Sequence, residues 1–281
     1  MKLLYLVLIL CLTTKIHAQL SSHFQRFILD NYDPSLLTQF NRGGKGWSFG
    51  GKKDEDDEVR KRPVIIVHGI TNKLDRFQKT INALLKKGYN KREVYGTTWG
   101  DGGGTPAPLV SLKCQYIKQI RLFIIAVSHY TKSDVDIVAY SMGSPIARKA
   151  ILGGKCVDVN EDLGPPLTKF ISTYISVAGA NYGSSLCIYP LPITICNKNN
   201  GLYCGSHFIQ DINSRQHYEG QNVYSIFSDS DEKVGTHGCG KYLSPIIGGF
   251  GYIKKRKMSH DDLMDKTIDI QINLLQRKNV S

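Results

Sequence analysis

The stretch Val135-Asp136-Ile137-Val138-Ala139-Tyr140-Ser141-Met142-Gly143 decides how this 281-residue chain is expected to fold. Residues 135–139 predict a strand buried on both faces of a parallel sheet, and Ser144–Leu152 predicts a helix. Between them, Ser141 has a small residue two positions away on each side, Ala139 and Gly143. A short Ser-x-Gly pattern can arise by chance, but a strand before it and a helix after it favour a nucleophile elbow. We therefore predict that Ser141 is a nucleophile whose hydroxyl is held above the sheet by the turn.

Outward from this stretch, strands and helices alternate along the chain. Strands are expected at 64–67, 93–99, 171–177 and 222–227, and helices at 73–88 and 109–130. The C-terminal residues fit either a strand or a helix, but Asp261 and Asp262 favour the start of a helix because acidic groups suit the positive end of the helix dipole. This alternation predicts an α/β fold with one doubly wound, mainly parallel sheet.

The N-terminus has the layout of a secretory signal peptide. Residues 1–18 combine a lysine, a short apolar run and a small residue, Ala18, before the expected cleavage site. The run is too short to span a bilayer, which takes about 20 residues, and no later segment is long and apolar enough. We expect a secreted, extracellular protein with no transmembrane segment. Its N-terminal extension would cover residues 19–62, with a solvated charge run near 52–62, and its main domain residues 63–281.

Cysteine usage agrees with export. Six cysteines remain after residue 18, and an even number in a secreted chain predicts disulfides: Cys114, Cys156, Cys187, Cys196, Cys204 and Cys239. The alternative is a zinc site, because Cys204 with His207 and His237 with Cys239 have ligand-like spacings. Oxidation competes for these thiols outside the cell, so disulfides are preferred and no metal is expected.

Composition excludes several classes of protein. Hydrophobic residues make up 41% and charged residues 21%, which fits a globular core rather than a disordered chain. Lysine and arginine outnumber aspartate and glutamate by 36 to 24, which favours anionic partners. The cluster at residues 254–257, Lys-Lys-Arg-Lys, has no nucleic-acid motif beside it, and export argues against nucleic acid. We read it as a solvated face or as a contact for an anionic lipid surface.

A second motif, Pro63-Val64-Ile65-Ile66-Val67-His68-Gly69-Ile70, lies upstream of the serine. A strand ending in His-Gly is where an α/β-hydrolase places its first oxyanion loop, in which backbone amides point at the developing oxyanion. The expected donors are the amides of Ile70 and Met142. The His68 side chain is expected to be structural.

The acid and the base should follow the serine in that order. After the strand at 222–227, Asp229 and Asp231 compete for the role of acid, and the other one should form a turn. His237 and His260 are the downstream bases. His260 is preferred because it lies just ahead of the last helix, where a loop can reach the serine over the sheet edge.

Residues 181–217 show no clear period and contain three cysteines. A loop of this length in a compact domain is usually functional or held by cross-links. We expect a disulfide-held surface over the site.

These motifs resemble the class 2 lipase family, which includes small secreted bacterial lipases and nematode lipase-like relatives. The resemblance rests on residues 63–70, on 139–143, on Ser225-Ile226-Phe227-Ser228 leading to Asp231, and on Ser259-His260-Asp261-Asp262-Leu263. Alanine at the first small position of the elbow is typical of this family. The resemblance implies an α/β-hydrolase fold and selects Asp231 and His260 for the triad.

The implied function is that of a secreted triacylglycerol lipase, a serine carboxylic-ester hydrolase of lipid catabolism that forms an acyl-enzyme and needs no metal or organic cofactor. Two alternatives remain at this stage. One is a short-chain esterase or another acyltransferase on the same fold. The other is a non-catalytic lipid-binding protein on a hydrolase scaffold.

Overall fold

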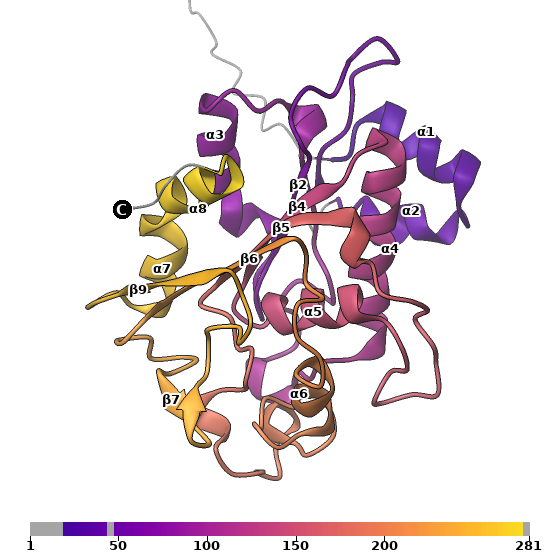
Figure 1. Ribbon diagram of the computed structural model, residues 1–281. Coiled ribbons are helices and arrows are strands. Elements are labelled where there is room, and N and C mark those ends of the chain that lie inside the picture. The colour runs from indigo at the N-terminus through magenta and orange to yellow at the C-terminus, as the bar shows by residue number, and fades with distance from the viewer. Residues whose placement is uncertain (1–18, 44–47, 278–281) are drawn as a thin grey trace, which may run out of the picture.

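The computed structural model describes residues 19–43 and 48–277, so the expected signal peptide at 1–18 lies outside the described residues. A seven-stranded sheet runs through the centre in the order β1-β3-β2-β4-β5-β6-β9 (Figure 1). All neighbouring strands are parallel except β1 and β3, which confirms the mainly parallel α/β-hydrolase sheet. The strands are β1 (Ser48–Phe49), β2 (Val64–Val67), β3 (Val94–Thr97), β4 (Val135–Tyr140), β5 (Ile171–Val177), β6 (Asn222–Ser228) and β9 (Gly251–Lys255).

Helices cover both faces of the sheet, as Figure 1 shows. One face carries α1 (Ser22–Asn31), α2 (Ser35–Phe40), α4 (Cys114–Thr131) and α5 (Gly143–Leu152), and the other carries α3 (Gln78–Lys86), α7 (His260–Lys266) and α8 (Ile268–Leu275). Each layer buries its own apolar cluster against the strands. The central strand β2 is an unbroken apolar run because both of its faces are covered. Below the sheet lie α6 (His207–Ile212) and the small hairpin of β7 (His237–Gly238) and β8 (Lys241–Tyr242). Within 19–43 and 48–277, no helix has both the length and the apolar character needed to cross a bilayer.

The segment expected as an N-terminal extension packs into the core of the main domain. Phe24, Ile28 and Phe40 from α1 and α2 are fully buried. Phe24 lies 4.4 Å, centroid to centroid, from Tyr130 on α4. These two short helices therefore complete the helical layer on the α4 face of the sheet.

Two expected helices have different bounds in the structure. The helix expected at 109–130 begins only at Cys114, and Leu109, expected in its buried stripe, is 58% exposed in a short 3-10 turn. The chain stays extended before Cys114 because the Leu112 amide bonds to Asn200 O at 2.8 Å, a partner far away in sequence. The C-terminal helix is two helices, α7 and α8, which meet at Thr267.

Two strands of the sheet, the short β1 and the edge strand β9, have no counterpart in the expected elements. β9 pairs with β6 from Tyr224↔Gly251 to Ser228↔Lys255, and it carries half of the basic cluster. Most of its side chains are exposed because it is an edge strand. β9 therefore lacks the continuous apolar run that reveals a central strand such as β2.

Three disulfides join the six cysteines of the described chain. They are Cys114–Cys156, Cys187–Cys196 and Cys204–Cys239. The last of these uses both thiols on which the zinc alternative depended. It also fastens residue 204, in the long insert, to the β7–β8 hairpin.

Asp136 is a buried acid on β4 whose ionisation should make stability depend on pH. Burial raises its pKa to about 6, and Arg62 Nη1 lies 3.8 Å from its Oδ1, beyond hydrogen-bonding distance. Since the folded pKa lies above the ordinary value of about 3.9, the charged carboxylate is disfavoured in the folded state. Stability should therefore fall as pH rises from about 4 to about 6 and stay lower above that range.

We expect Asp136→Asn to remove this cost and to raise the free energy of unfolding at pH 7.5 by up to about 2–3 kcal/mol. At pH 4 the variant and the parent should differ little. Urea unfolding at the two pH values measures both quantities. A variant that is less stable than the parent at pH 7.5 would show that Arg62 compensates the charge fully.

Candidate active site

Ser141 lies on the tight turn between β4 and α5, as the elbow pattern predicted. Its backbone φ is +55°, in the left-handed region that a non-glycine residue adopts only where the surrounding structure enforces it. The backbone that follows β2 passes so close to the elbow that a Cβ on Gly143 would lie 2.2 Å from His68 O. Glycine at 143 is therefore required by the close approach of the two motifs.

Three predicted side chains meet in one line of hydrogen bonds. Ser141 Oγ lies 2.9 Å from His260 Nε2, and His260 Nδ1 lies 2.9 Å from each carboxylate oxygen of Asp231. All three residues are buried, at 6%, 2% and 6% exposure respectively. They follow β4, begin α7 and follow β6, so the parallel sheet brings together groups up to 119 residues apart.

The loop after β6 aims Asp231 at the imidazole. Its Oδ1 accepts hydrogen bonds from the amides of Lys233 at 3.0 Å and Val234 at 2.9 Å. A carboxylate held in this way accepts the Nδ1 proton of His260 and leaves Nε2 as the acceptor for the serine hydroxyl. The arrangement can therefore withdraw a proton from Ser141 Oγ.

The competing acid and base lie elsewhere. The exposed Asp229 accepts a bond from the Lys257 amide at 3.2 Å and closes a turn. His237 is exposed on β7, and its ring lies 4.0 Å from that of Tyr242. Neither one is hydrogen-bonded to the other groups of the site in the described part of the chain.

His260 is also held from behind by two residues that the sequence did not suggest. Its amide donates to Glu232 Oε2 at 2.9 Å, and its carbonyl lies 3.2 Å from the Tyr140 hydroxyl. The Tyr140 ring lies 4.9 Å from the imidazole. Tyr140 stands next to the nucleophile in sequence, and only the packing of α7 under β4 reveals that it also contacts His260.

His68 has a structural position, as expected. Its ring stacks on Trp99 at 4.8 Å, its Nε2 accepts the Trp99 amide at 2.9 Å, and its Nδ1 lies 2.8 Å from Gly69 O. Burial lowers the pKa of His68 to about 4, so the ring is neutral at physiological pH. It therefore fixes the course of the chain ahead of Ile70.

The two amides expected to stabilise an oxyanion border the same hollow as the serine. Ile70 and Met142 both line the cavity above Ser141, and a Cβ on Gly69 would lie only 2.9 Å from the Ser141 Cβ. Within residues 19–43 and 48–277, neither amide donates a hydrogen bond to another protein group. Both are therefore available to an oxygen bound beside Ser141.

The cavity has a volume of about 500 Å³ and two kinds of lining residue. The insert provides an apolar wall through Leu186, Ile193, Ile195 and Leu202. Polar side chains also line the cavity, among them Arg76, Lys233 and Asp261. The expectation of a disulfide-held surface over the site is confirmed, because Cys187 and Cys196 also line the cavity and are bonded to each other.

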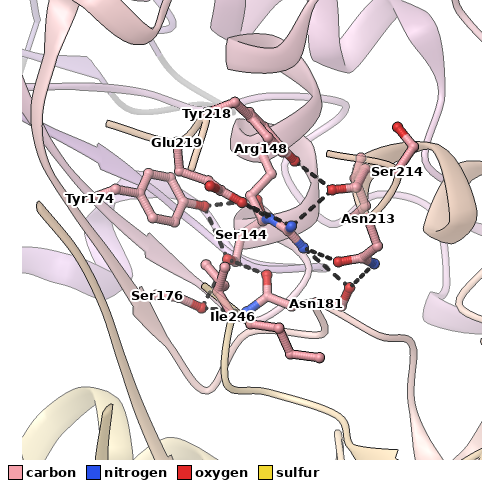
Figure 2. A network of polar contacts seen from close by, with 12 residues as sticks. Ser144, Arg148, Tyr174, Ser176, Asn181, Asn213, Ser214, Tyr218, Glu219 and Ile246 are labelled. Atoms are coloured by element: carbon pink, nitrogen blue, oxygen red, sulfur yellow. Dashed lines mark hydrogen bonds and ion pairs between the residues drawn. The ribbon is translucent and has the colours of Figure 1, made fainter. Parts of the chain in front are cut away.

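A buried polar network braces the helix that follows the elbow (Figure 2). Arg148 on α5 bonds to Glu219 Oε1, at 2.9 Å from Nε and 2.8 Å from Nη2, and to Asn213 Oδ1 at 3.0 Å. One turn earlier, Ser144 Oγ donates to Asn181 Oδ1 at 2.8 Å. The network ties α5 to both ends of the insert. Two adjacent cations, Arg148 and Lys149, within a helix of mostly small and apolar residues were its only signal in the sequence.

Comparison with known proteins identifies the family. The family described as Lipase (class 2) matches residues 61–273. The chain belongs to the class 2 lipase family. Membership of this family makes it a carboxylic ester hydrolase of lipase type, which confirms the family and the enzyme class expected from the sequence. No curated protein matches this chain significantly.

Solved lipases share the fold of this class 2 lipase family member at low sequence identity. The mature form of Bacillus licheniformis lipase BlEst2 is 13% identical, with a TM-score of 0.58, over 83% of this chain and 99% of that one. Aspergillus fumigatus lipase B is 14% identical, with a TM-score of 0.59, over 87% of this chain and 57% of that one. At such identities the likeness establishes the α/β-hydrolase fold alone.

Proposed function

We propose that this protein is a triacylglycerol lipase that works through Ser141, His260 and Asp231. The observation that carries the proposal is the unbroken line of hydrogen bonds from Asp231 through His260 to Ser141 Oγ at the base of a largely apolar cavity. An apolar wall suits the acyl chain of an ester, and the polar side chains suit its glycerol part.

The proposed reaction has two steps. Ser141 Oγ attacks the ester carbonyl carbon while its proton passes to His260 Nε2, and the amides of Ile70 and Met142 hold the carbonyl oxygen as it becomes negative. His260 then gives the proton to the departing alkoxide, which leaves as an alcohol. Water repeats the sequence on the acyl-enzyme, releases the carboxylic acid and regenerates Ser141.

Asp231 has two tasks in this scheme. It keeps the Nδ1 proton in place, so that Nε2 is free to act as the base. Its negative charge also stabilises the imidazolium that forms when His260 holds the serine proton.

Active-site titration with a fluorescent alkyl phosphonate tests the proposal. We expect labelling of the oxidised, secreted protein to approach one label per molecule and to disappear in Ser141→Ala. Ser133→Ala, at the opposite end of β4, is the matched control and should label like the parent. A folded protein that fails to label would instead support the non-catalytic lipid-binding alternative.

A chain-length series then separates lipase from short-chain esterase. Hydrolysis of long-chain triacylglycerol emulsions at rates comparable to those of short soluble esters supports the proposed substrate. Turnover restricted to short soluble esters would replace it with the esterase alternative.

We propose that the protein is secreted. Two features support this: the signal-peptide layout of residues 1–18, and three disulfides that pair every described cysteine. Expression of the full chain in animal cells tests it. Retention of the protein inside the cells would contradict it.

The basic cluster is proposed as a contact for an anionic lipid surface. Lys254, Arg256 and Lys257 are exposed at the end of β9 and in the turn that follows, a short distance in sequence before His260. We expect the change of residues 254–257 to alanine to weaken binding to phosphatidylserine-containing vesicles several-fold at low salt. If the variant binds vesicles with unchanged affinity, the cluster is a solvated face and not a lipid contact.

A further inference from the structure

The tip of the insert presents an unusual run of exposed apolar side chains. We call residues 186–193 the apolar loop. Five of its side chains are large, apolar and at least 40% exposed: Leu186, Ile188, Tyr189, Leu191 and Ile193. No charged residue occurs between Asn181 and Asn197. Exposed apolar side chains gathered in this way mark a contact surface.

We propose that the apolar loop inserts into a lipid surface and thereby brings the mouth of the cavity against it. The proposal deepens the proposed function, since it says how the site reaches a substrate that is insoluble in water. It can fail while the hydrolase activity stands, because the loop residues tested below lie outside the cavity wall.

The loop is constrained by a disulfide, two prolines and hydrogen bonds at its base. The Cys187–Cys196 disulfide closes its base, and Pro190 and Pro192 restrict its backbone. The Ser184 hydroxyl accepts the Leu186 amide at 3.2 Å and donates to Lys233 O at 2.7 Å. A loop pre-ordered in this way loses little conformational entropy when it binds.

The form of the loop fits a lipid surface better than a folded protein. Its exposed side chains are nearly consecutive at the tip of the insert, and those of Ile188, Tyr189 and Leu191 lie outside the cavity. Such a tip can enter the fluid boundary between headgroups and acyl chains, where the aromatic Tyr189 is also well suited.

Positive charge lies beside the loop. Ile188 packs over Gly238 of the β7–β8 hairpin, with its Cγ2 3.4 Å from where a Cβ on that glycine would be. The hairpin, drawn beside the insert in Figure 1, carries the exposed Lys241, and Lys254 lies over its Tyr242 at 5.9 Å. Apolar side chains flanked by lysines match the acyl chains and anionic headgroups of a charged lipid surface.

The same loop continues into the cavity. Leu186 and Ile193 are exposed outside and also line the cavity above Ser141. An acyl chain that leaves the lipid surface along the loop would therefore pass over apolar side chains until it reaches the serine. Docking at this loop delivers substrate without a separate transfer through water.

Vesicle binding by the full chain tests the proposal. In the Ser141→Ala background, which cannot consume the lipid, cosedimentation is measured with phosphatidylcholine vesicles that contain 30% phosphatidylserine, a composition chosen for the assay. We expect Tyr189→Ser/Leu191→Ser to weaken partitioning about thirtyfold or more, since two apolar side chains no longer enter the lipid. The loss should persist at high salt, because it does not arise from charge.

Leu29→Ser/Val159→Ser is the matched control. Leu29, on α1, has the same 43% exposure as Leu191, and Val159 is 49% exposed. The control should bind vesicles like its parent. Both double variants, made with Ser141 intact, should still hydrolyse a soluble short-chain ester, which shows that they are folded.

Two results would overturn the inference. One is unchanged vesicle binding by Tyr189→Ser/Leu191→Ser. The other is an equal loss in the control, which would indicate non-specific adsorption. If phosphonate labels Ser141 but the loop variant still binds vesicles, the hydrolase proposal stands and the docking proposal fails.

Discussion

Replacement of Asp231 by asparagine is expected to lower kcat about ten-thousandfold while leaving the fold intact. The side chains are nearly equal in size, so the amides of Lys233 and Val234 keep their acceptor. The amide group, however, carries no charge to stabilise the imidazolium, and its NH₂ can bind His260 in the tautomer that places the proton on Nε2. A proton on Nε2 removes the base from Ser141.

Asp229→Asn is the matched control, two residues earlier in the same loop. Asp229 is exposed and serves a turn, so its variant should retain activity within about twofold, as surface changes usually do. The measurement is kcat on a soluble ester, with circular dichroism to show that both variants are folded. Asp231→Asn with more than a tenth of the parent activity would contradict the proposed triad.

Breaking the Arg148–Glu219 pair is expected to cause the largest loss of stability. Both residues are 1% exposed. Four hydrogen bonds satisfy the guanidinium, two to Asn213 Oδ1 and Glu219 Oε1 and two to the carbonyls of Asn181 and Ile212, and Nη2 adds an ion pair with Glu219. Arg148→Met leaves the Glu219 carboxylate buried without its cation. The free energy of unfolding should fall by about 3–5 kcal/mol.

Two further variants separate the buried charge from the lost packing. Arg148→Met/Glu219→Gln should recover part of the loss, because no unpaired charge remains. Lys266→Met breaks the exposed pair with Asp262, 2.9 Å apart, and should cost about 1 kcal/mol or less. Denaturant unfolding measures all three, and a loss in Arg148→Met no larger than in Lys266→Met would refute the structural role of the network.

Local patterns in the chain were sufficient to predict the central strands and the elbow. The run 64–67 is apolar throughout because both of its faces are covered, and this signal does not depend on distant residues. The elbow was readable for a similar reason. Its residues at 139 and 143 are small because the backbone folds back tightly within the turn and passes close to the neighbouring His-Gly motif. The order of serine, acid and histidine then narrowed the partners of Ser141 to two acids and two bases.

Elements whose position depends on distant partners could not be read in this way. The edge strand β9 is exposed and polar, and it is a strand because β6 offers it hydrogen bonds. The start of α4 moves to Cys114 because Leu112 bonds to Asn200 across the fold. Cysteine count predicted disulfides but not their pairing, since pairing depends on which thiols the fold brings together.

The sequence by itself therefore determined the type of fold and the family, and it predicted Ser141 as the nucleophile, because each of these depends on spacing within a short stretch of chain. The residues left two acids and two bases open, the family resemblance selected Asp231 and His260, and the tertiary structure places these two side chains in line with Ser141. Only the tertiary structure shows that Tyr140 and Glu232 hold His260 by hydrogen bonds. It also shows that the apolar loop of the insert lies beside the cavity. These features are contacts between segments far apart in the chain, and such contacts exist only once the sheet has brought the ends of its strands together.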